Sequence, residues 1–146
     1  MTTTSAWNEA RAIEIIAEHE RLDGATLPIL HALQAAFGFI NDEAVQLVAG
    51  ALNLSRAEVH GVVSFYHDFH EAPDPRPVVQ ICRAEACKAR GVEAMIDEAT
   101  AAAGDRVKLA TVYCLGLCSS GPSARVGDRL HARLDAPKLA QIIENA

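Results

Sequence analysis

The sequence predicts an α+β protein in two parts, a small helical bundle over residues 1–76 and a mixed domain over residues 77–146. Three observations lead to this. Residues 8–69 repeat apolar positions at helical spacing between clear helix starts. The segment 71–77 then places three prolines within five residues, which no helix continues through. After it, short apolar runs alternate with one helical pattern and turn signals, as strands and helices do in a mixed domain.

Four helices are expected in the first part, each with a recognisable start. Thr26 lies two residues before Pro28, and proline is tolerated in the first turn because its missing N–H has no partner there. Asn41 can cap the third helix, and Ser55 with Glu58 forms an S-x-x-E capping box for the fourth. The expected ranges are 8–22, 26–37, 42–52 and 56–69.

The second part is expected to follow the order β-α-β-β-β-α. The runs "VVQIC" and "VKLATVY" predict strands over 78–82 and 107–113, and a helix over 91–104 between them ends at Gly104. Gly127-Asp128 joins 123–126 to 129–134 as a hairpin. A closing helix over 136–145 carries a proline near its first turn.

Composition excludes several classes of function. The formal charge of the 146 residues is −6, and no basic run occurs, which argues against binding to nucleic acid or to an anionic membrane surface. No apolar stretch approaches the roughly 20 residues of a membrane span, so no direct membrane insertion is expected. The N-terminal residues lack a basic region followed by an apolar block, and we therefore expect a cytoplasmic protein without a signal peptide.

The four cysteines are the main candidate for a functional site. They follow the pattern C-x4-C, then 26 residues, then C-x3-C, and each pair follows a predicted strand. If those two strands are neighbours, both pairs lie at the same edge of the sheet. The sequence therefore predicts that four sulfurs converge from two loops: Cys82, Cys87, Cys114 and Cys118.

Several kinds of site remain compatible with this spacing. A [2Fe–2S] cluster uses four cysteine ligands, with one pair commonly four residues apart. A structural zinc site with four cysteine ligands accepts spacings of two to four residues, so spacing alone does not exclude a zinc-stapled interaction module. Disulfides suit a reducing compartment poorly, and unliganded core cysteines rarely pair in this way. A thioredoxin-like thiol oxidoreductase is disfavoured because no C-x-x-C is present.

The residues flanking the cysteines favour a cluster, because four thiolates give such a centre negative charge that N–H donors and cations stabilise. We expect two glycines to let the backbone approach sulfur, two serines to offer hydroxyl donors and three cations to surround the first pair. Tight turns and an ordinary solvated surface are the competing explanations. These residues are, in order, Gly116 and Gly121, Ser119 and Ser120, and Arg83, Lys88 and Arg90. We find no motif for a catalytic site.

At these cysteines the chain resembles a known family. "VVQICRAEACKARG" and "VYCLGLCSSGPSARVGDRLHARLDAPKLAQII" resemble the thioredoxin-like [2Fe–2S] ferredoxin domain of the small NADH-dehydrogenase subunit of respiratory complex I. "LPILHALQAAFGFINDEAVQLVAGALNLSRAEVHGVVSFYHDF" resembles the helical segment that precedes this domain in the family. The similarity covers about residues 10 to 145. It implies that the four cysteines are the cluster ligands, one for one.

Within the family, the chain looks most like the gamma subunit of NAD-dependent molybdenum formate dehydrogenase. The segments "RAEA" and "CKARG", Lys88 after the second cysteine, and "SSGPSARV" where complex I subunits commonly carry "NAP" carry this resemblance. It implies an electron-transfer subunit with one [2Fe–2S] cluster and no active site of its own. The implied partners are a flavoprotein with FMN and NAD, and an alpha subunit with the molybdenum cofactor and further iron–sulfur clusters. The matching subunits of complex I and of NAD-reducing hydrogenases are the alternatives.

Overall fold

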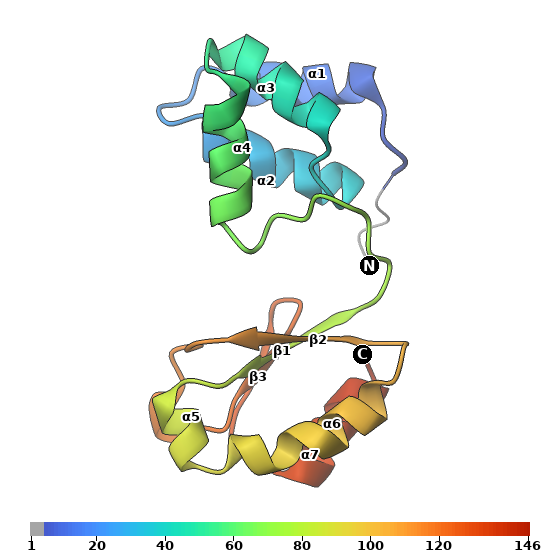
Figure 1. Cartoon of the computed structure of the whole chain (residues 1–146), viewed down its shortest axis with the longest axis vertical. Coiled ribbons are helices and arrows are strands. Elements are labelled where there is room, and N and C mark those ends of the chain that lie inside the picture. The colour runs from blue at the N-terminus through green and yellow to red at the C-terminus, as the bar shows by residue number, and fades with distance from the viewer. Residues whose placement is uncertain (1–4) are drawn as a thin grey trace. The chain divides into compact units, whose positions relative to one another are not determined.

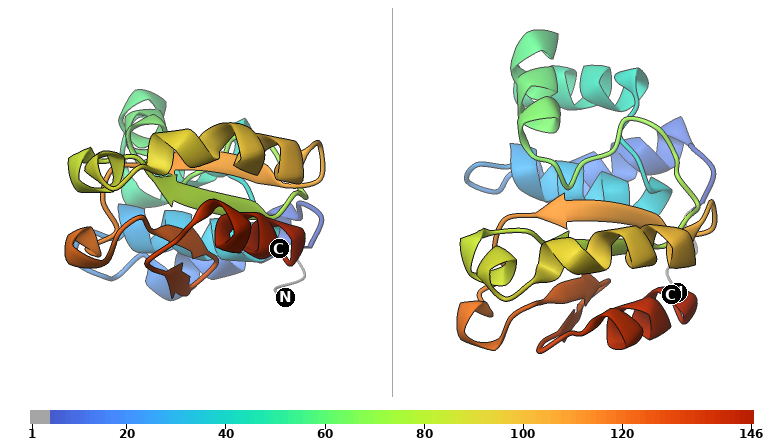
Figure 2. Two further views of the ribbon diagram at one scale, coloured as in Figure 1. Left: turned by 90° about the horizontal axis from the view of Figure 1, so that it is seen from below. Right: turned by 60° about the horizontal axis from the view of Figure 1, so that its bottom comes forward.

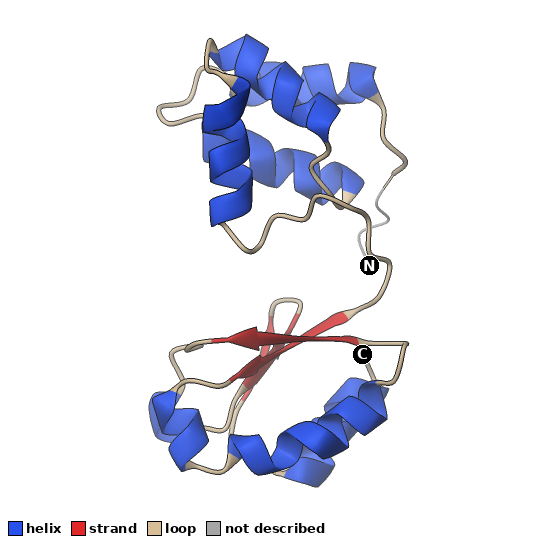
Figure 3. Ribbon diagram, viewed as in Figure 1, coloured by secondary structure: helices blue, strands red, loops and turns tan. Residues whose placement is uncertain are grey.

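The computed structural model describes residues 5–146, and the chain divides into two compact units, Met1–Asp74 and Pro75–Ala146. The described helices of the first unit and the mixed sheet and helices of the second confirm the α+β class (Figure 3). The predicted boundary, between residues 76 and 77, lies close to this division. That each unit folds as an independent domain remains a prediction.

The first unit holds four helices, and side chains cap three of them as the sequence predicts. Asn8 and Asn41 each accept a backbone N–H from the first turn that follows, at 2.9 and 2.8 Å. Ser55 and Glu58 form both hydrogen bonds of the capping box. Such caps satisfy N–H groups that the helix itself leaves free. The helices are α1 (Glu9–His19), α2 (Thr26–Phe37), α3 (Asp42–Leu52) and α4 (Arg56–Phe65).

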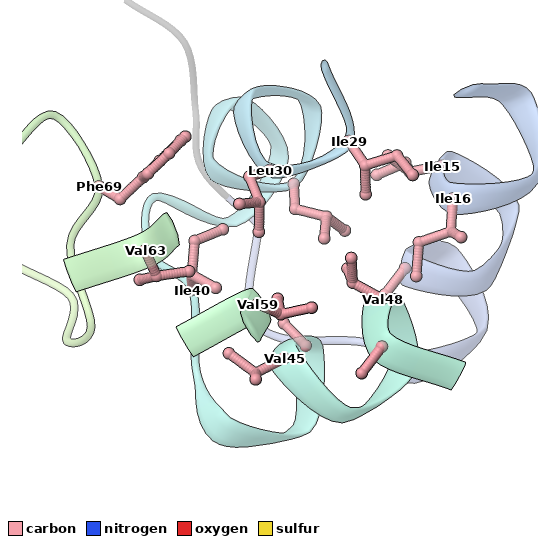
Figure 4. Close-up of a cluster of buried hydrophobic side chains, with 14 of the residues drawn as sticks. Ile15, Ile16, Ile29, Leu30, Ile40, Val45, Val48, Val59, Val63 and Phe69 are labelled. Carbon is pink, nitrogen blue, oxygen red and sulfur yellow. The ribbon is translucent and has the colours of Figure 1, made fainter. Parts of the chain in front are cut away.

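Aliphatic side chains from all four helices meet in the core of this unit (Figure 4). Ile29, Leu30 and Val59 have no exposed surface, so their burial contributes the full hydrophobic term, about 1.5–3 kcal/mol for each side chain. Trp7 packs beside this core, with its ring centroid 4.9 Å from that of Phe37. The first unit therefore has a hydrophobic core of its own.

Helix α4 ends earlier than the sequence predicts. The expected helix ran to residue 69, whereas α4 ends at Phe65, and Tyr66 takes an extended conformation. The side chain of Gln34 accepts the backbone N–H of His70 at 2.7 Å and donates to the carbonyl of Asp68. These bonds from α2 replace the helical ones, and Phe69 turns into the core with 7% of its surface exposed.

The second unit is built on a four-stranded mixed sheet in the order β2-β1-β3-β4. Strands β1 (Val78–Cys82) and β2 (Lys108–Val112) run parallel, and their register places Cys82 beside Val112. Strands β3 (Ala124–Val126) and β4 (Arg129–His131) form the predicted hairpin, and β3 pairs antiparallel with β1. The neighbouring position of β1 and β2, which the cysteine argument requires, is thus present.

Helices cover one face of this sheet. Helices α6 (Ile96–Ala103) and α7 (Ala136–Glu144) lie side by side beneath it (Figures 1 and 2). The single helix expected over 91–104 is wrong in its first turn, where the 3-10 helix η1 (Val92–Met95) precedes α6. The short helix α5 (Glu85–Ala89) was not predicted. Within residues 5–146, no helix combines the length and apolar character that crossing a bilayer requires.

Candidate metal centre

The four cysteines lie at one end of the sheet of the second unit. Cys82 is the last residue of β1, and Cys114 follows β2 by two residues. Cys87 lies in α5, and Cys118 begins the 3-10 helix η2 (Cys118–Ser120). All four line a single cavity of about 310 Å³. The parallel pairing of β1 and β2 therefore brings together two cysteine pairs that lie far apart in the chain.

Within this cavity the thiols form two pairs that differ in exposure. Cys82 and Cys87 are hydrogen-bonded to each other, and each is 2% exposed. The Sγ atoms of Cys114 and Cys118 lie 3.4 Å apart on the exposed side. All four are free thiols. Among residues 5–146, no three His, Cys, Asp or Glu side chains are arranged to hold one metal ion, so the two-plus-two arrangement is the feature to explain.

Backbone N–H groups point at the sulfurs, as a negatively charged centre requires. Cys82 receives backbone hydrogen bonds from Ala84, Cys114 and Leu115. Gly116 donates its N–H to Cys114 Sγ at 3.3 Å, and its positive φ of 75° is one that glycine adopts without strain. The glycine predicted to aim an N–H group at sulfur is therefore confirmed at position 116. Cys114 itself has a φ of 105°, a strained conformation of the kind that collects at functional sites.

The pKa values of the thiols show that each pair shares protons. Burial acts to raise the pKa of Cys82, but the backbone donors and the Cys87 thiol outweigh it, and the pKa is lowered. Burial raises the pKa of Cys87, and the neighbouring Cys82 adds to this. The hydrogen bond with Cys114, and then its charge, raise the pKa of Cys118. A metal that replaces these protons relieves the repulsion within each pair, because metal-bound cysteine is a thiolate.

A buried serine, rather than the predicted ones, supplies a hydroxyl at the site. Ser123 is 1% exposed, and its Oγ lies 3.7 Å from Cys87 Sγ. Among the described residues, neither Ser119 nor Ser120 is hydrogen-bonded to a cysteine sulfur. The prediction of hydroxyl donors at those two positions is therefore wrong. No local signal marks Ser123, because the pairing of β3 with β1 is what brings it to the cysteines.

Close approach of the backbone is confirmed at Gly121. A Cβ atom at this position would lie 2.9 Å from Cys87 Sγ, closer than real side chains come. The backbone φ of Gly121 is −71°, so the requirement for glycine here is steric and not conformational. The buried sulfur of Cys87 thus depends on the absence of a side chain at this position.

Of the three predicted cations, one is neutralised by a carboxylate. The guanidinium of Arg83 makes two hydrogen bonds to Glu93, at 2.9 and 2.5 Å. Lys88 and Arg90 are exposed, as an ordinary solvated surface would place them. The negative charge of a bound centre is therefore countered mainly by N–H and O–H donors rather than by free cations close to the first pair.

The donor set fits a two-iron centre. A [2Fe–2S] cluster takes two thiolates on each iron, and the sulfides bridge the irons. Two thiol pairs on one cavity, with N–H donors directed at sulfur, supply the ligands that this arrangement needs. A zinc site instead surrounds one ion with four sulfurs in a tetrahedron. The division into a buried and an exposed pair suits the former better.

Comparison with known proteins gives one family for nearly the whole chain. The model of the family described as thioredoxin-like [2Fe-2S] ferredoxin matches residues 12–146. The NADP-reducing hydrogenase subunit HndA of Solidesulfovibrio fructosivorans is 26% identical, over 90% of this chain and 82% of that protein. A small subunit of the NADH-quinone oxidoreductase of Rhizobium meliloti is 32% identical, over 83% of this chain and 77% of that protein.

A solved structure supports the same fold. A chain of an NAD+-reducing [NiFe]-hydrogenase in the air-oxidised state superposes with a TM-score of 0.67 and 25% identity. The match covers 82% of this chain but only 22% of the hydrogenase chain. The similarity therefore concerns one part of a larger polypeptide.

Proposed function

This chain belongs to the thioredoxin-like [2Fe–2S] ferredoxin family, and on that premise we propose that its four cysteines hold the cluster. The family carries one [2Fe–2S] cluster, and its members here are small electron-transfer subunits of NAD-linked oxidoreductase complexes. The observation that carries the proposal is the convergence of two thiol pairs on one cavity. The proposed ligands are Cys82, Cys87, Cys114 and Cys118.

The residues of the site hold the cofactor and control access to it. When bound, the cluster accepts and returns one electron at a time. The buried pair, Cys82 and Cys87, keeps water from one side, whereas Cys114 and Cys118 lie on the exposed side. Tyr113, next to that pair, is 76% exposed, which supports a partner surface at this edge. Electrons would enter and leave there.

For the complex, we propose the gamma-type subunit of an NAD-dependent formate dehydrogenase in the cytoplasm. There, two electrons from formate would pass to NAD+, giving CO2 and NADH. The sequence features between and after the cysteines, including Lys88 and "SSGPSARV", support this assignment. The partners would be a flavoprotein that binds FMN and NAD, and an alpha subunit that binds the molybdenum cofactor and further iron–sulfur clusters.

A second candidate is the equivalent subunit of an NAD(P)-reducing hydrogenase. The similarity to HndA and to the solved hydrogenase chain favours it. The similarity to small subunits of NADH-quinone oxidoreductase supports a third assembly of the same type. The three assemblies differ in their electron donor, so they can be separated by experiment.

We expect the native complex, purified through a tag on this chain, to contain molybdenum and to show the reduced cluster signal when formate is added. The cluster signal serves as the readout because this chain carries the cluster, whichever partner oxidises the donor. NADH is the positive control, since all three assemblies exchange electrons with a nicotinamide. A complex that contains nickel and is reduced by hydrogen, but not by formate, would assign the chain to a hydrogenase.

A further inference from the structure

Ser123 is a buried polar side chain whose hydroxyl faces a cysteine. It is 1% exposed, and its Oγ lies 3.7 Å from Cys87 Sγ, within hydrogen-bond range for sulfur. A buried hydroxyl without a partner is unfavourable, so a serine at this position requires an acceptor. Alanine would fill nearly the same space without that requirement. The hydroxyl therefore needs an explanation beyond packing.

The backbone around Ser123 fixes its position. The carbonyl of Ser123 accepts the N–H of Cys82 at 3.0 Å, and the carbonyl of Pro122 accepts the N–H of Leu134 at 3.1 Å. The next residue, Ala124, pairs with Ile81 in the ladder between β3 and β1. The hydroxyl is thus held against Cys87 by bonds on both sides of it. A freely rotating surface serine would not be held in this way.

The direction of the hydrogen bond follows from the state of the sulfur. In a free thiol either atom can donate. A cysteine bound to iron has lost its proton, so the Ser123 O–H must then donate to Cys87 Sγ. A donor withdraws negative charge from the sulfur and stabilises the reduced state, which carries one more negative charge, more than the oxidised state. Hydrogen bonds to the sulfurs are among the factors that set the potential of such clusters.

We propose that Ser123 is a positioning residue that acts through Cys87 and raises the reduction potential of the cluster. The inference rests on the proposed function, because it requires Cys87 to be a ligand. Among the described residues, the exposed pair has no matching hydroxyl: the N–H of Gly116 donates to Cys114 Sγ at 3.3 Å. The buried pair therefore carries a side-chain donor that substitution can remove, while the backbone donors stay in place.

The test is a redox titration of the purified chain, followed by its EPR signal, for the wild type and three variants. Ser123→Ala is expected to shift the midpoint potential downward, because the hydroxyl donor is lost. Ser123→Thr keeps the hydroxyl and is expected to remain close to the wild type. Ser119→Ala removes an exposed serine beside Cys118 and serves as the matched control. In deuterated buffer, the Fe–Sγ stretching frequencies of the wild type should shift more than those of Ser123→Ala.

Iron is counted first, so that two failures stay distinct. A wild-type chain without a two-iron cluster would overturn the proposed function itself. An intact cluster whose potential is the same in Ser123→Ala and the wild type would overturn the role of Ser123 alone. If Ser123→Ala binds no cluster, Ser123→Gly is titrated instead. Loss of the cluster in both variants would make the hydroxyl a structural requirement and would also overturn a role in setting the potential.

Discussion

Replacing Cys118 with alanine is expected to reduce the iron content from about two atoms per chain to nearly none. Cys118 lies on the exposed side of the cavity, 3.4 Å from its pair partner Cys114. One iron would lose a thiolate that no neighbouring side chain can replace. Because the side chain is exposed, the free energy of unfolding of the metal-free chain should change by less than about 0.5 kcal/mol. Iron analysis and urea unfolding of the same preparations measure both quantities.

The control for this variant is the adjacent residue. Ser119 is also exposed and lies in the same 3-10 helix, so Ser119→Ala repeats the change of size without removing a sulfur. It should retain the iron content and absorption spectrum of the wild type. A Cys118→Ala chain with a full complement of iron would exclude Cys118 from the ligand set, and would leave the exposed pair without its proposed role.

Replacing Gly121 with alanine is expected to weaken cluster binding on the order of 10- to 100-fold, the range seen when residues that support metal ligands are changed. The new Cβ would lie 2.9 Å from Cys87 Sγ and 3.4 Å from the Cδ of Arg90. Arg90 can move, but the sulfur cannot move without leaving its place in the cavity. Overpacking of this kind also costs about 1–3 kcal/mol of folding stability. Cluster loss to a chelator over time, and urea unfolding, measure the two effects.

Gly50 provides the comparison for this substitution. It lies in α3, and an added Cβ there meets no atom within 4 Å. Gly50→Ala should bind the cluster as the wild type does, and should stabilise the helical unit by up to about 1 kcal/mol because alanine favours the helix. If Gly121→Ala behaved like Gly50→Ala, the close contact with Cys87 would be absent in solution.

The local signals in the sequence predicted much of the fold because they act over a few residues. Asn41 and the Ser55–Glu58 box cap their helices where the pattern places them. The β1 strand has the bounds that the apolar run "VVQIC" indicates. The meeting of the cysteine pairs followed from one further assumption, that the two strands preceding them are neighbours, and this assumption is confirmed.

The features that the sequence did not reveal depend on contacts between distant residues. Helix α4 ends early because Gln34, on another helix, bonds to the chain after it. Helix α5 is only five residues long, too short for a periodic pattern to mark. Ser123 reaches Cys87 only because β3 pairs antiparallel with β1. Ser119 and Ser120 lie nearer to a cysteine in the chain, and this closeness was misleading.

The central claim is that the two thiol pairs hold a two-iron cluster rather than a zinc ion. The most direct test is an EPR spectrum of the anaerobically purified chain before and after reduction with dithionite, with iron and zinc counted in the same sample. We expect a rhombic signal that appears only on reduction, with about two irons per chain. A colourless protein that gives no signal and contains about one zinc would contradict the account and make the four cysteines a structural staple.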